Sequence, residues 1–162
     1  MPRLVLVRHA KAVDRMDADD DFERGLTPRG RNDAADTAMT LHKAGVCISL
    51  ALVSPAQRTL QTFIAMKEAL GNPAFEDPMA LYHASPDMLL RAATEALDRA
   101  DTVMLVGHNP GIGVLAQNLA ERAGRLQEMP DGYPTSAATV FTSTNPSLDR
   151  LTLDLIIDPK AR

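Results

Sequence analysis

Five short apolar runs recur along the chain and predict buried β-strands. Each is rich in Leu, Val, Ile or Ala, which is typical of strands that are covered on both faces of a sheet. The runs are Leu4–Val7, Leu50–Val53, Thr102–Val106, Ala137–Thr142 and Leu151–Ile156. Longer stretches with helical spacing separate them. This alternation predicts an α/β fold with a mostly parallel central sheet.

Three of the intervening stretches place their apolar residues on one helical face. These faces consist of Leu60, Phe63, Ile64 and Leu70, of Leu89, Ala93, Ala96, Leu97 and Ala100, and of Ile112, Leu115, Ala116, Leu119 and Ala123. A capping side chain followed by Pro marks a helix start, because the fixed φ of Pro suits the first helical position. The four such pairs are Thr27-Pro28, Ser54-Pro55, Ser85-Pro86 and Asn109-Pro110. Gln57, three residues after Ser54, adds the spacing of a capping box.

Two segments have the composition of loops. Residues 14–25 are rich in Asp, and residues 124–134 contain several Gly and Pro. We expect the acidic run to be solvated rather than to bind a metal, because a calcium-type loop needs ordered ligands around a central Gly. No such pattern is present.

Composition narrows the class of protein. The 162 residues suit one domain over residues 1–162, and 45% apolar with 23% charged residues is ordinary for a globular protein. A net charge of −4 with only 4% aromatic residues argues against a nucleic-acid partner. The apolar runs are too short for a signal peptide or a membrane span. Cys47, the single cysteine, allows no intrachain disulfide, and we expect it to be a small buried hydrophobe in a cytoplasmic protein without membrane contact.

Polar residues follow three of the predicted strands where ligands bind in an α/β fold. Arg8 and His9 follow the first strand, Arg58 comes shortly after the second, and His108 and Asn109 follow the run that ends at Val106. Ligands in open α/β sheets bind beyond the carboxyl ends of the strands, so these side chains are expected to meet at one edge.

Two arginines and two histidines in one place suit phosphoryl chemistry. Guanidinium groups grip phosphate oxygens bidentately and stabilise the charge that spreads over them during transfer. The same positive field disfavours protonation of a nearby imidazole, and neutral imidazole is the nucleophilic form. The residues alone therefore predict a site for phosphoryl chemistry, in which Arg8 and Arg58 hold the phosphoryl group and a neutral imidazole, that of His9 or His108, is the nucleophile.

At these residues the chain resembles the histidine phosphatase superfamily, the phosphoglycerate-mutase-like clan. The matching blocks occur in the family order and are Leu6-Val7-Arg8-His9-Ala10, Leu26-Thr27-Pro28-Arg29-Gly30, residues 54–62 with Arg58, and Val106-Gly107-His108-Asn109-Pro110. The resemblance implies a three-layer α/β/α sandwich with transient phosphorylation of His9. Arg8, Arg58, His108 and Asn109 would bind the phosphorylated substrate. The resemblance implies no metal and no organic cofactor.

The short segment between the second and third predicted helices leaves no room for the helical lid of larger members. This short segment, together with residues 134–137, resembles the SixA-type phosphohistidine phosphatases. That resemblance implies a phosphohistidine-bearing protein as substrate. The general acid stays open among Glu76, Asp77, His83 and Asp87. A phosphohistidine has a good leaving group, so it needs less help from an acid than an alkyl phosphate.

Other interpretations remain open. The first alternative is a small-molecule or general phosphomonoesterase, and the second is a phosphate-binding adaptor without turnover. Residues 111–116 fit the dinucleotide pattern G-x-G-x-x-A, but three residues separate them from the preceding strand, so close packing of small residues is the simpler explanation. Lys11 is expected to be solvated rather than to contact substrate, and Thr135 and Ser136 to form a turn before the next strand rather than to border the site. Tyr82 is expected to pack, and His83 to lie at or near the surface.

Overall fold

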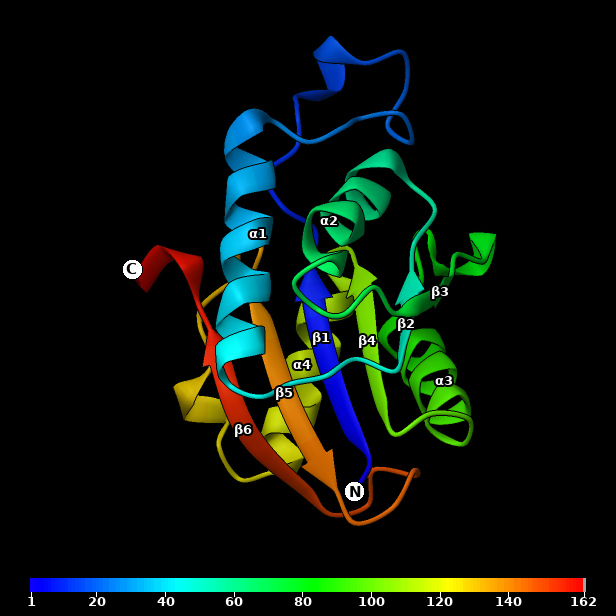
Figure 1. The fold of residues 1–162 in the computed structure, drawn as a ribbon, viewed down its shortest axis with the longest axis vertical. Coiled ribbons are helices and arrows are strands. Elements are labelled where there is room, and N and C mark those ends of the chain that lie inside the picture. The colour runs from blue at the N-terminus through cyan, green and yellow to red at the C-terminus, as the bar shows by residue number, and fades with distance from the viewer. Residues whose placement is uncertain (162) are drawn as a thin grey trace.

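The computed structural model describes residues 1–161 and shows six strands and four α-helices within them (Figure 1). The strands are β1 (Arg3–Arg8), β2 (Leu50–Val53), β3 (Ala74–Glu76), β4 (Thr102–Gly107), β5 (Ala138–Ser143) and β6 (Leu151–Ile157). The helices are α1 (Pro28–Lys43), α2 (Gln57–Lys67), α3 (Pro86–Leu97) and α4 (Gly111–Arg122). No helix in this part of the chain is long and apolar enough to cross a membrane.

All six strands form one sheet in the order β3-β2-β4-β1-β5-β6. The first four strands in this order pair in parallel, and β5 and β6 are added antiparallel at one edge. The sheet is therefore mixed but mostly parallel, as the sequence predicts.

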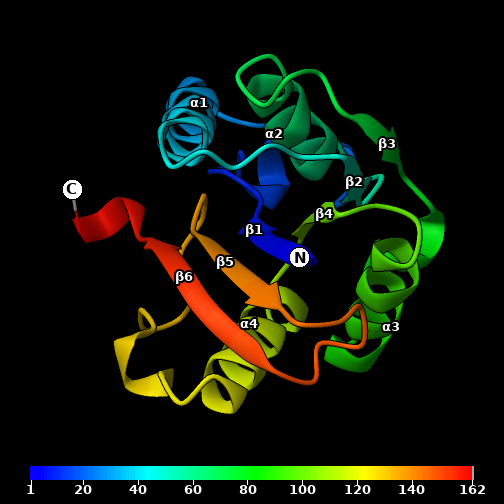
Figure 2. The ribbon, with the colours of Figure 1, turned by 60° about the horizontal axis from the view of Figure 1, so that its bottom comes forward.

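The strand alternation divides the core into two layers. In β1, Leu4 and Leu6 pack with α3 and α4, while Val5 and Val7 pack with α1 and α2. Figure 2 shows these two pairs of helices on opposite faces of the sheet. The predicted three-layer α/β/α sandwich is thus confirmed, and no helical lid covers the sheet edge in the described residues.

The five predicted strands are confirmed with small shifts at their ends, whereas β3 was not predicted. Its three residues are all exposed, so neither alternation nor burial marks them in the sequence. Parallel pairing with β2 alone defines this strand.

Two of the four predicted helix caps are confirmed. Thr27 accepts the N–H of Gly30 at the start of α1, and Ser85 accepts the N–H of Met88 at the start of α3. The Ser54 cap and its capping box are wrong, because α2 begins only at Gln57 after Ala56. The backbone N–H of Ser54 instead extends the ladder to the carbonyl of Val106.

The fourth predicted start is displaced. Pro110 precedes α4 as its cap residue rather than occupying the first helical position. Oδ1 of Asn109 nevertheless accepts the N–H of Gly113 at 3.1 Å. Asn109 therefore caps the first turn of α4 from the position before the cap residue Pro110.

Two burial predictions are wrong. Ile64 is 58% exposed, because it lies on the outer side of α2 while Phe63 carries the core contact. Cys47 is exposed, because it lies in the loop between α1 and β2, where its neighbours Val46 and Ile48 turn inward instead.

Candidate active site

The register of the sheet brings the predicted residues together. Arg8 at the end of β1 pairs with Gly107 at the end of β4, so His9 and His108 follow on adjacent strands. The N–H of His9 donates to the carbonyl of Gly107 at 3.1 Å, and the two imidazole rings lie 5.5 Å apart. β2 ends beside β4, which brings the first turn of α2 and Arg58 to the same edge.

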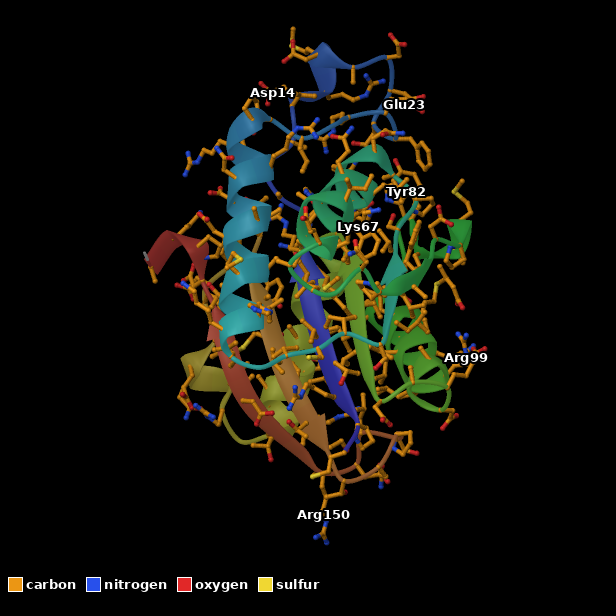
Figure 3. All side chains as sticks on the ribbon, in the orientation of Figure 1. Asp14, Glu23, Lys67, Tyr82, Arg99 and Arg150 are labelled. Atoms are coloured by element: carbon orange, nitrogen blue, oxygen red, sulfur yellow. The ribbon has the colours of Figure 1, made fainter. Side chains whose placement is uncertain are left out.

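A polar cavity of about 220 Å³ opens at this edge. Arg8, His9, Arg58, His108 and Asn109 all line it, so the structure brings together every site residue predicted from the sequence. In Figure 3 the labelled Asp14, which also lines the cavity, lies at the end of the molecule opposite Arg150.

His9 has a defined tautomer. Its Nδ1 lies 2.8 Å from the backbone carbonyl of Ala10, and because a carbonyl can only accept, Nδ1 carries the proton. Nε2 of the neutral ring therefore has a free lone pair. The N–H of Ala10 donates to Thr62 Oγ1 of α2 at 2.9 Å, so the residue whose carbonyl orients the ring is itself held to α2.

Both histidines are neutral at physiological pH. Burial, reinforced by the guanidinium groups of Arg8 and Arg58, lowers the pKa of His9 to about 4. Burial and the charge of Arg58 lower the pKa of His108 to about 3. The site thus has two uncharged imidazoles between fixed positive charges.

The two arginines are held from different directions. Arg58 is 5% exposed and donates Nη1 to the backbone carbonyl of Asp21 at 2.8 Å and Nη2 to its carboxylate at 3.0 Å. Arg8 donates Nη1 to the carbonyl of Tyr133 at 3.2 Å. Burial, with the nearby positive charge of Arg58, lowers the pKa of Arg8.

Several polar atoms of the site have no partner within the protein. Of the four buried side-chain polar atoms that lack a hydrogen bond within residues 1–161, three are Nε of Arg8, Nε of Arg58 and Nδ1 of His108. Buried polar groups in native proteins are nearly always paired, so this cluster indicates a polar ligand. Two guanidinium donors and an imidazole fit an anion.

His108 is oriented by Ser54. Nε2 of His108 lies 2.7 Å from Ser54 Oγ, so the hydroxyl that the sequence assigns to a helix cap serves the site instead. Because Nε2 is engaged, Nδ1 is the atom of this ring that remains free for a ligand.

Asn109 lines the cavity, but its amide is engaged with the protein. Nδ2 donates to the carbonyls of Gly132 and Tyr133 at 2.9 and 3.1 Å, and Oδ1 accepts from Gly113. A Cβ at Gly113 would lie 2.7 Å from this Oδ1, so the glycine is explained by close packing. The role of Asn109 in substrate binding stays a prediction.

Several residues of this region were not assigned to the site from sequence. Lys11, Asp14 and Thr135 line the cavity, and Arg24, Tyr82 and Asp21 form a hydrogen-bonded group at or beside it. Arg24 lines the cavity, where it pairs with Asp21 at 3.0 Å. Tyr82 donates its hydroxyl to the Asp21 carboxylate at 2.6 Å, and together with Arg58 and Arg24 this bond holds the pKa of Asp21 well below its usual range. Asp21 and Arg24 lie in the acid-rich loop, which has no periodicity, so no sequence signal separates them from their solvated neighbours.

The four acid candidates separate in space. Glu76 is paired with Arg99 at 2.9 Å, and Asp87 lines a different cavity with Ser147. His83 shares a cavity with His108, and Asp77 lines none of the cavities described. Within residues 1–161 no group of three His, Cys, Asp or Glu side chains is placed to hold a metal ion.

Comparison with known proteins identifies related chains. The family model of the histidine phosphatase superfamily (branch 1) matches residues 4–79. An uncharacterized protein of Picosynechococcus is 30% identical over 122 residues, which are 72% of each chain.

Solved structures agree in fold over nearly the whole chain. The SixA protein of Agrobacterium tumefaciens is 29% identical with a TM-score of 0.86, and the match covers 98% of this chain and 99% of that one. The protein histidine phosphatase SixA in complex with tungstate is 25% identical with a TM-score of 0.81, covering 98% of both chains.

Proposed function

Because this chain belongs to the histidine phosphatase superfamily and is a phosphatase, we propose that it hydrolyses phosphohistidine on a protein through a phosphorylated His9. The observation that carries this proposal is the convergence of Arg8, His9, Arg58 and His108 on one polar cavity of about 220 Å³. A neutral imidazole with a free Nε2 beside two guanidinium groups is suited to attack on a bound phosphoryl group.

The first step is transfer of the phosphoryl group to the enzyme. Nε2 of His9 attacks phosphorus, the bond from phosphorus to the leaving nitrogen breaks, and its electron pair stays on that nitrogen, which takes a proton from water. Arg8 and Arg58 bind the equatorial oxygens, where charge develops in the transition state. Nδ1 of His108 donates a further hydrogen bond.

The second step is hydrolysis of phosphorylated His9. A water molecule attacks phosphorus, the bond to Nε2 breaks, and the electron pair returns to the ring. Phosphate leaves with the oxygen of the water, and its proton passes to solvent. The hydrogen bond from Nδ1 to the Ala10 carbonyl keeps the ring in the same tautomer before and after each turnover.

Phosphohistidine is favoured over phosphate esters by the lack of a suitable acid. Asp21 is held ionised by Tyr82 and Arg58, so its carboxylate has no proton to give. Glu76 is paired with Arg99, which also keeps its pKa low. An alkyl oxygen leaves poorly without protonation, whereas an imidazole nitrogen leaves well. Two solved structures that are 29% and 25% identical to this chain are SixA proteins, which supports the same substrate class.

The test combines turnover with labelling. The protein is incubated with a ³²P-phosphohistidine protein and, separately, with an aryl phosphate, and the release of phosphate and the acid-labile label on the enzyme are followed. We expect fast release from the phosphohistidine, slow attack on the ester, and label on His9. His9→Ala should lose both label and turnover, whereas the matched control His42→Ala, at an exposed position of α1, should keep both.

Three outcomes would contradict the proposal. A clear preference for the aryl phosphate would indicate a general phosphomonoesterase. Phosphate binding without release from either substrate would indicate an adaptor. Full turnover by a folded His9→Ala protein would remove His9 from the mechanism.

A further inference from the structure

A second cavity adjoins the phosphate cavity and shares His108 and Asn109 with it. It has a volume of about 320 Å³ and lies between the segment that leads into α3 and the start of α4. Most of its wall is apolar, formed by Leu81, Ala84, Pro86, Leu89 and Pro110. An apolar wall offers a charged phosphate no hydrogen bonds, so this cavity suits another part of the substrate.

Two imidazoles are among the polar groups of this second cavity, together with Ser85 and Asn109. His83 and His108 line it, and Tyr82 lies between them, with its ring 3.9 Å from His83 and 5.6 Å from His108 in an edge-on arrangement. The three rings thus form one aromatic cluster beside the reacting centre. Planar rings pack on such clusters by offset or edge-on contact.

The backbone at His83 is unusual. Its φ is +62°, in the left-handed region that non-glycine residues rarely adopt. The turn holds the His83 ring beside Tyr82 at the edge of the cavity, and the hydroxyl of Tyr82 is fixed by Asp21, which also binds Arg58. The wall of the second cavity is therefore connected by direct contacts to the arginine of the first.

We propose that this cavity binds the leaving group of the substrate and that the group it accepts is the imidazole ring of the phosphohistidine. The inference rests on the proposed function, since it divides one substrate between the two cavities. The phosphoryl group lies against Arg8 and Arg58, the ring lies against Leu81, Ala84 and Leu89, and the bond that breaks passes His108, which belongs to both walls.

The experiment compares two substrates with the same type of bond. Free phosphohistidine and phosphoramidate both contain a P–N bond, but only the first has a ring. We expect wild-type kcat/KM to favour phosphohistidine by about tenfold or more, the size of effect that a filled apolar pocket provides. Ala84→Leu should fill the cavity and abolish this preference, while kcat/KM for phosphoramidate and the inhibition constant of inorganic phosphate stay unchanged.

The matched control is Ser147→Leu, which introduces the same side chain at the wall of a third cavity that shares no lining residue with the other two. It should keep the wild-type preference. A second variant, His83→Asn, removes the ring while keeping a residue that tolerates positive φ. It should reduce the preference without changing phosphate inhibition, and circular dichroism checks that each variant is folded.

Each contrary result has its own meaning. An Ala84→Leu protein with the wild-type preference, or one that loses both substrates equally, would overturn the leaving-group assignment while leaving the phosphatase proposal intact. A wild-type preference for 4-nitrophenyl phosphate that Ala84→Leu abolishes would overturn the choice of imidazole. Failure of the wild-type protein to hydrolyse both P–N substrates and the ³²P-phosphohistidine protein would overturn the proposed function and this inference with it. Turnover of the phosphohistidine protein without turnover of free phosphohistidine would overturn this inference alone.

Discussion

The two histidines of the site differ from ordinary surface histidines mainly in burial. His9 is 7% exposed, and its Nδ1–H donates to the Ala10 carbonyl, so protonation of the ring would place a second proton on Nε2 in a largely buried and positively charged environment. This explains why its pKa falls to about 4 and why the lone pair on Nε2 stays available.

A pH profile tests this state of His9. Because the group that must be neutral has a pKa of about 4 in the free enzyme, kcat/KM should not fall across the ordinary histidine pKa near 6.5. After correction for the ionisation of the substrate, we expect it to decrease only below about pH 5. Stopped assays from pH 4 to 8 measure kcat/KM. A decrease in kcat/KM that follows a pKa near 6.5 and does not come from the substrate would show that His9 is not held in the described environment.

Arg58 carries the second prediction at this scale. Loss of its guanidinium in Arg58→Ala should lower kcat/KM by about 10²–10³-fold, the usual effect of removing one donor that stabilises transition-state charge. The inhibition constant of inorganic phosphate should rise less, because the ground state carries less of the developing charge. Arg99→Ala, which removes an exposed arginine paired with Glu76, is the matched control and should keep full activity. Equal kcat/KM in the two variants would remove Arg58 from the site.

The sequence identifies the residues that react but not those that hold them. Arg8, His9, Arg58 and His108 follow strand ends or occupy a first helical turn, and their positions can be inferred from periodicity. Asp21 reaches Arg58 across 37 positions of the chain from a loop. Such contacts depend on how the loop folds back over α2, which no local pattern records.

At the scale of elements, the pairs of capping residue and Pro are the most instructive. Thr27 and Ser85 are free to cap because each follows a loop. Ser54 follows β2 directly, and its N–H still belongs to the sheet, so its side chain faces His108 instead of the helix. The same sequence motif therefore has a structural role in two places and a role in the site in the third.

Alanine substitutions separate these roles. Ser85→Ala should lower the free energy of unfolding by about 1 kcal/mol, the typical cost of losing a helix cap, with little change in kcat/KM. Ser54→Ala should instead lower kcat/KM several-fold, because His108 loses the partner that orients its ring. Urea unfolding and steady-state assays on both variants measure the two quantities. Loss of activity in Ser85→Ala with none in Ser54→Ala would reverse the assignment.

At the scale of the whole molecule, the sheet order is what creates the site. Periodicity predicts the strands of the core and two layers of helices, but it does not specify that β4 lies between β2 and β1. That order places three strand ends beside one another and brings together residues 8, 58 and 108. The exposed strand β3 could not be predicted from sequence for a similar reason. Its place in the sheet is set by pairing with β2 and not by the pattern of its own residues.

Burial of two uncharged imidazoles makes the stability of the fold depend on pH. The folded pKa of His9 is about 4 and its ordinary value is 6.5, so between these values the unfolded chain binds more protons than the folded one. The free energy of unfolding should therefore be constant with respect to His9 above pH 6.5 and fall as the pH decreases below it. At about 1.4 kcal/mol per pH unit, His9 alone lowers it by about 2 kcal/mol at pH 5.

His108 acts in the same direction, since its pKa is lowered to about 3, whereas Asp21, with its pKa below the usual range, loses its contribution only at lower pH. Urea unfolding at pH 7 and pH 5 therefore reports mainly on the histidines. His9→Gln, which keeps a polar side chain without a titrating ring, should reduce the difference between the two pH values. An equal difference in His9→Gln and wild type would mean that the stability at pH 5 is governed elsewhere, and that His9 is not buried as a neutral ring.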